Sequence, residues 1–243
     1  MRYSLDNKIA IVTGGNSGIG RAIAEALTEQ GATVHTLDLE GDGPRHHSCD
    51  VTQQREVAAT VDRIASAGPI DLLINNAGIG FVGDLEQTTE ADLDRLYAVN
   101  VKGVYNCALA CVKHMKERGG VILNMASIAG TVGLADRFAY SMTKGAVLSM
   151  TYSIAKDYLA YGIRCNSISP ARVHTDFVDN FIAKNYPGRE QEMFAQLSAT
   201  QPIGRMGQPR EIADLAVYLC SDEASFITGT DFPIDGGFIR LNS

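Results

Sequence analysis

The chain has 243 residues, 45% of them hydrophobic, and a formal net charge of −7 at pH 7. This length suits one α/β domain with a sizeable core, and the acidic balance argues against nucleic acid and anionic membranes as partners. No apolar run reaches the roughly 18 residues of a membrane-spanning helix, and the first residues form no apolar signal sequence, so we expect a cytoplasmic protein.

The cysteines and histidines are not spaced as metal ligands. The cysteines are odd in number and scattered, and no Cys-x-x-Cys pattern occurs. The adjacent His46 and His47 are poorly placed to share a metal ion and are more typical of a solvated strand start. We therefore expect reduced thiols and no metal site. The cysteines are Cys49, Cys107, Cys111, Cys165 and Cys220.

The N-terminal segment predicts a strand, a glycine-rich turn, a helix and a second strand. Residues Lys8–Thr13 form a short apolar run of the kind found in buried parallel strands. Helical periodicity covers Arg21–Gln30, and Ala32–Leu37 predicts a second strand that ends at Asp38. Four glycines lie between the first strand and the helix, namely Gly14, Gly15, Gly18 and Gly20.

This order is typical of a dinucleotide-binding site. Glycines permit a tight turn and let backbone N–H groups at a helix start approach a pyrophosphate. Asp38 follows Gly20 by 18 residues, near the usual spacing of about 20 for an acid that accepts from a ribose 2′-OH. A carboxylate there repels a 2′-phosphate, and no Arg or Lys flanks it in TLDLEGDG. The pattern favours NAD over NADP; the alternative is a glycine-rich turn in an unrelated α/β protein.

The rest of the chain alternates strands and helices, which predicts a doubly wound, mostly parallel sheet of Rossmann-like type in three α/β/α layers. We expect a single domain over 1–243, with a mobile, polar helical insertion around 176–205 covering the site. The further strands are expected at His47–Val51, Asp71–Ile74, Gly120–Met125, Ile163–Ile168 and Phe232–Ile234. The further helices are expected at Gln53–Ser66, Thr89–Lys116 (possibly two helices that meet near Asn100), Phe138–Tyr161 and Pro209–Cys220.

Tyr140 and Lys144 are four residues apart in AYSMTKGAV, so a helix places them on one face. A neighbouring ammonium favours the phenolate, which lowers a tyrosine pKa from about 10 and prepares the group for proton transfer. The hydroxyl of Ser127, thirteen residues upstream of Tyr140, could hold a substrate oxygen.

A second pair, Tyr152 and Lys156, has the same spacing. It lies about 18 Å farther along the helix and is rotated by about 120°, so both pairs cannot face one ligand. Tyr140 begins the helix near the predicted strand ends, which favours the first pair. We expect Tyr152 and Lys156 to be packing or subunit-contact residues.

Five motifs in order make the chain resemble the short-chain dehydrogenase/reductase family over essentially its whole length. The segments NSISPARVHT and FITGTDFPIDGGF also fit that family. The motifs are Thr13-Gly14-x-x-x-Gly18-x-Gly20, Asn75-Asn76-Ala77-Gly78, Asn100 in VNVKG, Ser127 in MASIAG, and Tyr140 with Lys144 in YSMTK.

The resemblance implies a nicotinamide-dependent oxidoreductase that acts on a small molecule and assembles as a homotetramer through the helices around residues 92–116 and 138–161. In the family Asn100 holds a water through its backbone carbonyl, and the pair at Asp50 and Val51 lies against the adenine. The implied catalytic residues are Asn100, Ser127, Tyr140 and Lys144. The implied NAD-binding residues are Gly14, Asn16, Ser17, Gly18, Ile19, Gly20, Asp38, Asp50, Val51, Asn76, Ala77, Gly78, Tyr140, Lys144, Pro170, Val173 and Thr175.

Two arginines bear on the substrate, which is also expected to contact Ser127 and Tyr140. Arg137 precedes Tyr140 by three residues, and Arg172 follows the nicotinamide-binding turn, where Ala171 replaces the family's usual glycine. The planar fork of arginine suits a carboxylate, and family members with an arginine just before the tyrosine include enzymes of short hydroxy acids and deoxy-sugar acids. We therefore prefer a hydroxy or keto acid as substrate.

Three alternatives stay open. The arginines could be surface residues paired with Asp136, Asp176 or Asp179, and the substrate could then be a neutral sugar or polyol. Reduction of an acyl-carrier thioester usually runs on NADP, which Asp38 disfavours. The chain could also bind NAD as a sensor without catalysis, although degenerate members commonly lose one of the four catalytic residues.

Overall fold

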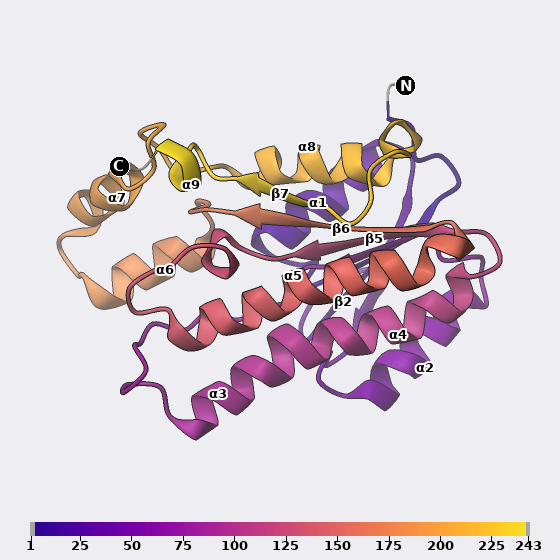
Figure 1. Ribbon diagram of the computed structural model, residues 1–243, viewed down its shortest axis with the longest axis horizontal. Helices are drawn as coiled ribbons and strands as arrows, with labels where there is room; N and C mark the ends of the chain where they lie inside the picture. Colours follow the sequence, from indigo (N-terminus) through magenta and orange to yellow (C-terminus); the bar gives the residue numbers. More distant parts are fainter. Residues whose placement is uncertain (1–2, 242–243) are drawn as a thin grey trace.

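Seven parallel strands form one sheet in the order β3-β2-β1-β4-β5-β6-β7 in the computed structural model, which describes residues 3–241 (Figure 1). The predicted doubly wound α/β class is confirmed, and every pairing among the described strands is parallel. The strands are β1 (Ile9–Thr13), β2 (Thr33–Asp38), β3 (His46–Ser48), β4 (Leu72–Asn75), β5 (Gly120–Met125), β6 (Ile163–Pro170) and β7 (Asp231–Ile234).

Helices cover both faces of the sheet because successive strand residues point to opposite sides. Val12 packs in a core beneath α1 (Gly18–Glu29) and α8 (Pro209–Cys220). Its neighbour Ile11 packs in a second core with residues of α2 (Gln54–Ala65) and α4 (Gly103–Met115). The remaining helices are α3 (Glu90–Tyr97), α5 (Phe138–Tyr158), α6 (Asp176–Asn185), α7 (Glu190–Ala199) and α9 (Phe238–Leu241). Within residues 3–241, no helix combines the length and the apolar character needed to cross a membrane.

The strand order reverses at β1, which lies between β2 and β4. Loops that leave the carboxyl ends of β1 and β4 run in opposite directions at such a point, and ligands of open parallel sheets bind there. Figure 1 shows α6 and α7 beyond the arrowheads of β5 and β6, on the same side as these loops. The glycine-rich turn, Asp38, Asn76 and Ser127 all follow or end strands at this edge.

Several boundaries differ from the prediction. β3 covers His46–Ser48 instead of 47–51, because the Asp50 carboxylate accepts the Thr52 N–H at 2.9 Å and turns the chain. α1 begins three residues earlier, so that it includes Gly18 and Gly20, and β6 extends to Pro170. The helical region 89–116 consists of α3 and α4 joined by a π-helical turn, Ala98–Lys102, at the position where two helices were expected to meet.

Candidate functional site

The turn between β1 and α1 depends on two glycines. Gly14 adopts a left-handed φ of 61°, and a Cβ at that position would lie 3.0 Å from Cα of Ala77. A Cβ at Gly20 would overlap the carbonyl oxygen of Gly14. Thr13 fixes the neighbouring loop, because its Oγ1 accepts the backbone N–H groups of Asn76 and Ala77, each at 3.0 Å. Side chains at Gly14 and Gly20 would therefore displace the turn from the loop after β4.

The start of α1 suits an anion. Ser17 is the N-cap residue and makes no side-chain cap hydrogen bond, so it leaves N–H groups of the first turn, which includes Ile19, to other acceptors. A cleft of about 280 Å³ opens beside Gly18 on the outer side of the helix start; its lining includes Thr175 but also the carboxylates of Glu25, Asp176 and Asp179, so the cleft itself does not suit an anion. The glycine turn and the uncapped helix start therefore fit a dinucleotide.

Asp38 presents an oriented carboxylate at the end of β2. Its Oδ2 accepts the Asn16 N–H at 3.1 Å, and its Oδ1 accepts the Leu39 N–H at 2.9 Å. Since each carboxylate oxygen can accept about two hydrogen bonds, both keep capacity for a ribose hydroxyl.

The residues predicted to contact the adenine, Asp50 and Val51, lie in the turn after β3. The carbonyl of Val51 accepts from Nδ2 of the buried Asn106 at 2.8 Å. Sequence reasoning missed Asn106; the only signal was an amide among the apolar positions of the helix Gly103–Met115.

Asn100 connects three parts of the site. Its Nδ2 donates to the Ile79 carbonyl at 2.9 Å and to Oγ1 of Thr143 at 3.1 Å, while its Oδ1 accepts the Ile79 N–H at 2.8 Å. A Cβ at Gly78 would lie 3.3 Å from Oδ1 of Asn100 and 3.6 Å from Nζ of Lys144. The π-helical turn thus fixes the loop after β4 against α5, and Thr143 is a contact that the sequence did not reveal.

Ser127, Tyr140 and Lys144 come together at the end of β5. Ser127 hydrogen-bonds with the Tyr140 side chain, and its Oγ accepts the Ala129 N–H at 3.2 Å. The buried Nζ of Lys144 donates to the Met125 carbonyl at 2.7 Å and lies 5.8 Å from the centre of the Tyr140 ring. The second pair lies apart, because Tyr152 and Lys156 are exposed on α5.

The pKa shifts of Tyr140 and Lys144 differ from those expected from the sequence. Burial raises the pKa of Tyr140, and the hydrogen bond with Ser127 and the positive charge of Arg137 oppose that rise. Burial lowers the pKa of Lys144 to about 8. The expectation that the Tyr140 pKa is pulled down is wrong, because burial raises it; the Lys144 ammonium hydrogen-bonds the Met125 carbonyl and is not among the groups that oppose the rise.

The lowered Lys144 pKa has a measurable consequence for stability. Between about pH 8 and 10.5, the ordinary value, the unfolded chain binds more protons than the folded protein, so stability rises with pH in that window and the penalty is fully present below it. From about pH 7 to about pH 9.5, we expect the free energy of unfolding of the wild type to rise by about 2 kcal/mol relative to Lys144→Met. Urea unfolding of both proteins at the two pH values measures this difference. A constant difference would contradict the burial of a charged lysine.

The arginines lie near one another without an acidic partner in residues 3–241. Nη1 of Arg137 donates to the backbone carbonyl of Asp136 at 2.8 Å, and the buried Nε of Arg172 has no hydrogen-bond partner in that range. Burial and the charge of Arg137 lower the pKa of Arg172. Asp179 accepts from His174 at 2.9 Å instead of pairing with Arg172. The two cations are therefore available to an anionic ligand.

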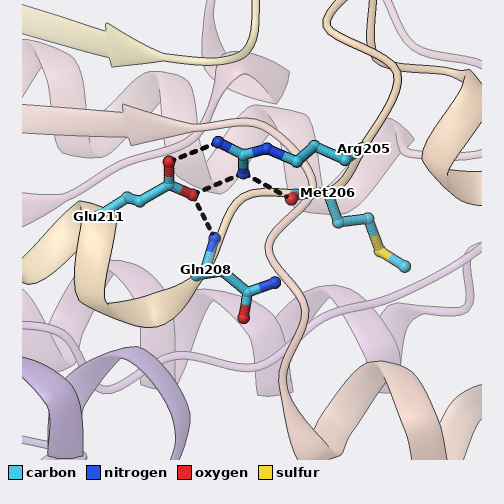
Figure 2. A network of polar contacts seen from close by, with 4 residues as sticks. All are labelled: Arg205, Met206, Gln208 and Glu211. Carbon is cyan, nitrogen blue, oxygen red and sulfur yellow. Dashed lines mark hydrogen bonds and ion pairs between the residues drawn. The ribbon is translucent and has the colours of Figure 1, made fainter.

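The segment that carries Arg172 is fixed by backbone hydrogen bonds with Gly207. Gly207 donates to the Arg172 carbonyl at 2.9 Å and accepts the His174 N–H at 2.8 Å, which places the predicted cofactor residue Val173 opposite it. Figure 2 shows that the loop around Gly207 is fixed by Arg205, whose guanidinium donates to both oxygens of Glu211 at 2.7 and 2.8 Å. Hydrogen bonds from the Arg205 guanidinium and from the Gln208 backbone N–H lower the pKa of Glu211 to about 2.

The replacement of the family's glycine by Ala171 causes no backbone strain. Ala171 follows Pro170 at the end of β6 and is not among the residues with positive φ. Its N–H donates to the Ile234 carbonyl of β7 at 3.2 Å. The added methyl group therefore leaves the turn attached to the sheet.

Comparisons with known proteins place the chain among dehydrogenases. A family model described as enoyl-(acyl carrier protein) reductase matches residues 14–239. The 2-keto-3-deoxy-L-fuconate dehydrogenase of Xanthomonas campestris pv. campestris is 38% identical over 246 residues, which cover 96% of this chain and 81% of that protein. The D-threitol dehydrogenase of Mycolicibacterium smegmatis is 36% identical over 252 residues, 97% of this chain and 94% of that protein. The ligand-free aldohexose dehydrogenase of Thermoplasma acidophilum superposes with a TM-score of 0.93 at 35% identity, covering 98% of this chain and 97% of that chain.

Proposed function

The chain belongs to the short-chain dehydrogenase/reductase family, and from this we propose that it uses NAD to interconvert a secondary alcohol and a ketone in a small hydroxy acid or deoxy-sugar acid. The observation that carries the substrate class is the arginine pair, since Arg137 and the buried Nε of Arg172 have no acidic partner among the described residues. A buried donor without a hydrogen-bond partner is costly, and a carboxylate that accepts from the Nε of Arg172 and from a neighbouring guanidinium N–H would satisfy it. The preference for NAD rests on Asp38, whose carboxylate suits ribose hydroxyls and repels a 2′-phosphate.

In the proposed mechanism for oxidation, Tyr140 accepts the proton of the substrate hydroxyl while the carbinol carbon loses a hydride. A bound nicotinamide supplies the hydride acceptor. Ser127, which hydrogen-bonds with the Tyr140 side chain, donates to the substrate oxygen and fixes its position. Lys144 is mostly protonated at neutral pH, since its pKa is about 8, and its ammonium would hold the cofactor ribose.

The relatives are dehydrogenases, which favours an enzyme over a sensor, and their names suggest two substrate classes. The fuconate dehydrogenase acts on a sugar acid and the threitol dehydrogenase on a neutral polyol, so both classes are supported by similar identity. The unpaired arginines favour the acid, because a neutral polyol would leave the Arg172 Nε without an anionic acceptor. Reduction of an acyl-carrier thioester, suggested by the description of the family model, is disfavoured because that reaction usually runs on NADP, which Asp38 opposes.

Steady-state kinetics on a panel of hydroxy acids and neutral sugars, repeated with Arg137→Ala, tests the proposal. We expect kcat/KM of the wild type to be higher on acids, and the variant to lose about 10- to 100-fold on acids only, as for a hydrogen bond to a charged group. Arg210→Ala is the matched control, because Arg210 pairs with Glu29 and Asp214 on the surface of α8. Equal rates on acids and neutral sugars, or equal losses on both, would contradict the acid assignment.

We also propose a cytoplasmic homotetramer whose single domain covers its substrate with residues 176–205. α6 and α7 occupy that segment and lie beyond the carboxyl ends of the strands (Figure 1). Exposed Tyr105 and Leu109 on α4, and Met142 and Tyr152 on α5, support an assembly through these helices. The five buried free thiols suit a reducing compartment.

A further inference from the structure

The side chain of Asn16 in the glycine-rich turn is held in one orientation. Its Nδ2 donates to the Glu40 carbonyl at 2.5 Å and lies 3.0 Å from Nδ1 of His46. The short contact with a carbonyl identifies this atom as the amide nitrogen, so Nδ1 of His46 must accept. The hydroxyl of Thr36, on the neighbouring strand, lies 3.4 Å from the same Nδ1. His46, expected to be a solvated residue at the strand start, is thus half-buried and bonded to the dinucleotide turn.

The loop after β2 packs directly on this contact. Gly41 has a φ of 152°, and a Cβ there would overlap Nδ2 of Asn16 and lie 3.0 Å from Cε1 of His46. Only a glycine permits the backbone to approach so closely. The amide of Asn16 is therefore enclosed by Glu40, Gly41 and His46.

The enclosed residue orients the carboxylate of Asp38. The backbone N–H of Asn16 donates to Oδ2 of Asp38 at 3.1 Å, while the Leu39 N–H donates to Oδ1 at 2.9 Å. With one hydrogen bond to each oxygen, the carboxylate cannot rotate freely, and one acceptor position on each oxygen remains for a vicinal diol. A carboxylate held in this way also cannot turn away from a 2′-phosphate.

We propose that His46, acting through Asn16, is a positioning residue that sets the preference for NAD over NADP. The inference rests on the proposed use of NAD. It assigns a role to His46, which is connected to Asp38 through the hydrogen bonds of Asn16. Loss of the acceptor on His46 would leave the Asn16 amide with the Glu40 carbonyl as its remaining acceptor, which would loosen the turn and the orientation of the carboxylate that binds ribose.

Equilibrium titrations of NADH and NADPH with the full-length protein test this role. The chain contains no tryptophan, so the emission of the reduced cofactor can be followed without transfer from indole. For His46→Ala we expect the Kd of NADH to rise about five- to tenfold, as for one lost hydrogen bond, while the Kd of NADPH stays constant or falls. His46→Gln, which restores an acceptor, should return the Kd of NADH toward the wild-type value.

His47→Ala is the matched control. Its ring faces the opposite side of β3, with Nε2 at 3.0 Å from Nδ1 of His35 and the two rings stacked at 5.2 Å. An unchanged Kd of NADH in His46→Ala would overturn the inference. Equal weakening by His46→Ala and His47→Ala without rescue by His46→Gln would also overturn it, because this pattern indicates general loosening of β3. A wild-type protein that binds NADPH as tightly as NADH would contradict the proposed use of NAD. The wild-type titration alone reveals this outcome, independently of the His46 variants.

Discussion

Replacing Tyr140 with Phe is expected to lower kcat by about 10³-fold, within the range of general acid–base contributions, and to leave the Kd of NADH within about twofold. The Tyr140 phenol hydrogen-bonds with the Ser127 side chain, whose other partner is the Ala129 N–H, a backbone group that cannot accept a proton. Phenylalanine in its place leaves no acceptor at that position for the proton of a substrate hydroxyl. The ring itself stays, because phenylalanine keeps the packing of the first turn of α5.

Single-turnover kinetics and NADH titration of the same preparation separate chemistry from cofactor binding. Tyr152→Phe is the matched control, since Tyr152 has the same spacing to a lysine on the same helix but is exposed. It should retain the wild-type kcat. Turnover at the wild-type rate in Tyr140→Phe would remove the assigned proton transfer from the mechanism.

The second large effect is expected for Gly20→Ala. The new methyl group would overlap the carbonyl oxygen of Gly14 and lie against Nδ2 of Asn76, so the turn after β1 must shift. Overpacking of this kind costs about 1 to 3 kcal/mol of stability. The displaced turn also contains the N–H groups expected to bind the pyrophosphate, so the Kd of NADH should rise roughly 100-fold, equivalent to about 2.8 kcal/mol.

Gly145→Ala provides the control, because Gly145 is also a helical glycine near the site. A Cβ there would meet only the Gly130 carbonyl oxygen at 3.8 Å, an ordinary contact. It should stabilise α5 by about 0.5 to 1 kcal/mol and leave NADH binding unchanged. Urea unfolding and NADH titration measure both effects. Wild-type NADH affinity in Gly20→Ala would show that the turn tolerates displacement and does not bind the phosphates.

The order of strands and helices was predictable because buried parallel strands are short apolar runs and their flanking helices are periodic. α8 matches its predicted bounds from Pro209 to Cys220, since proline marks its start. The errors occur where side chains override the local pattern. β3 stops before Asp50 because that carboxylate bonds the following backbone, and α1 includes glycines of low helix propensity because tertiary packing against Gly14 requires them.

The candidate site was predictable only as a set of residues. The sequence predicted Tyr140 and Lys144 at the start of a helix near the strand end that carries Ser127, yet the direction of the Lys144 ammonium toward the Met125 carbonyl depends on the packing of α5 against β5. The supporting contacts of Thr143, Asn106 and His46 come from elements distant in sequence, and no local pattern distinguishes them from ordinary polar residues.

The paired hydrogen bonds between Gly207 and the residues on either side of Val173 close the segment between them into a loop with fixed ends. α6 and α7 lie wholly inside this loop, whereas the sheet lies wholly outside it. Recombination between relatives could therefore exchange residues 176–205 as one unit and replace the proposed substrate cover, while Thr175 and the arginine pair stay in place.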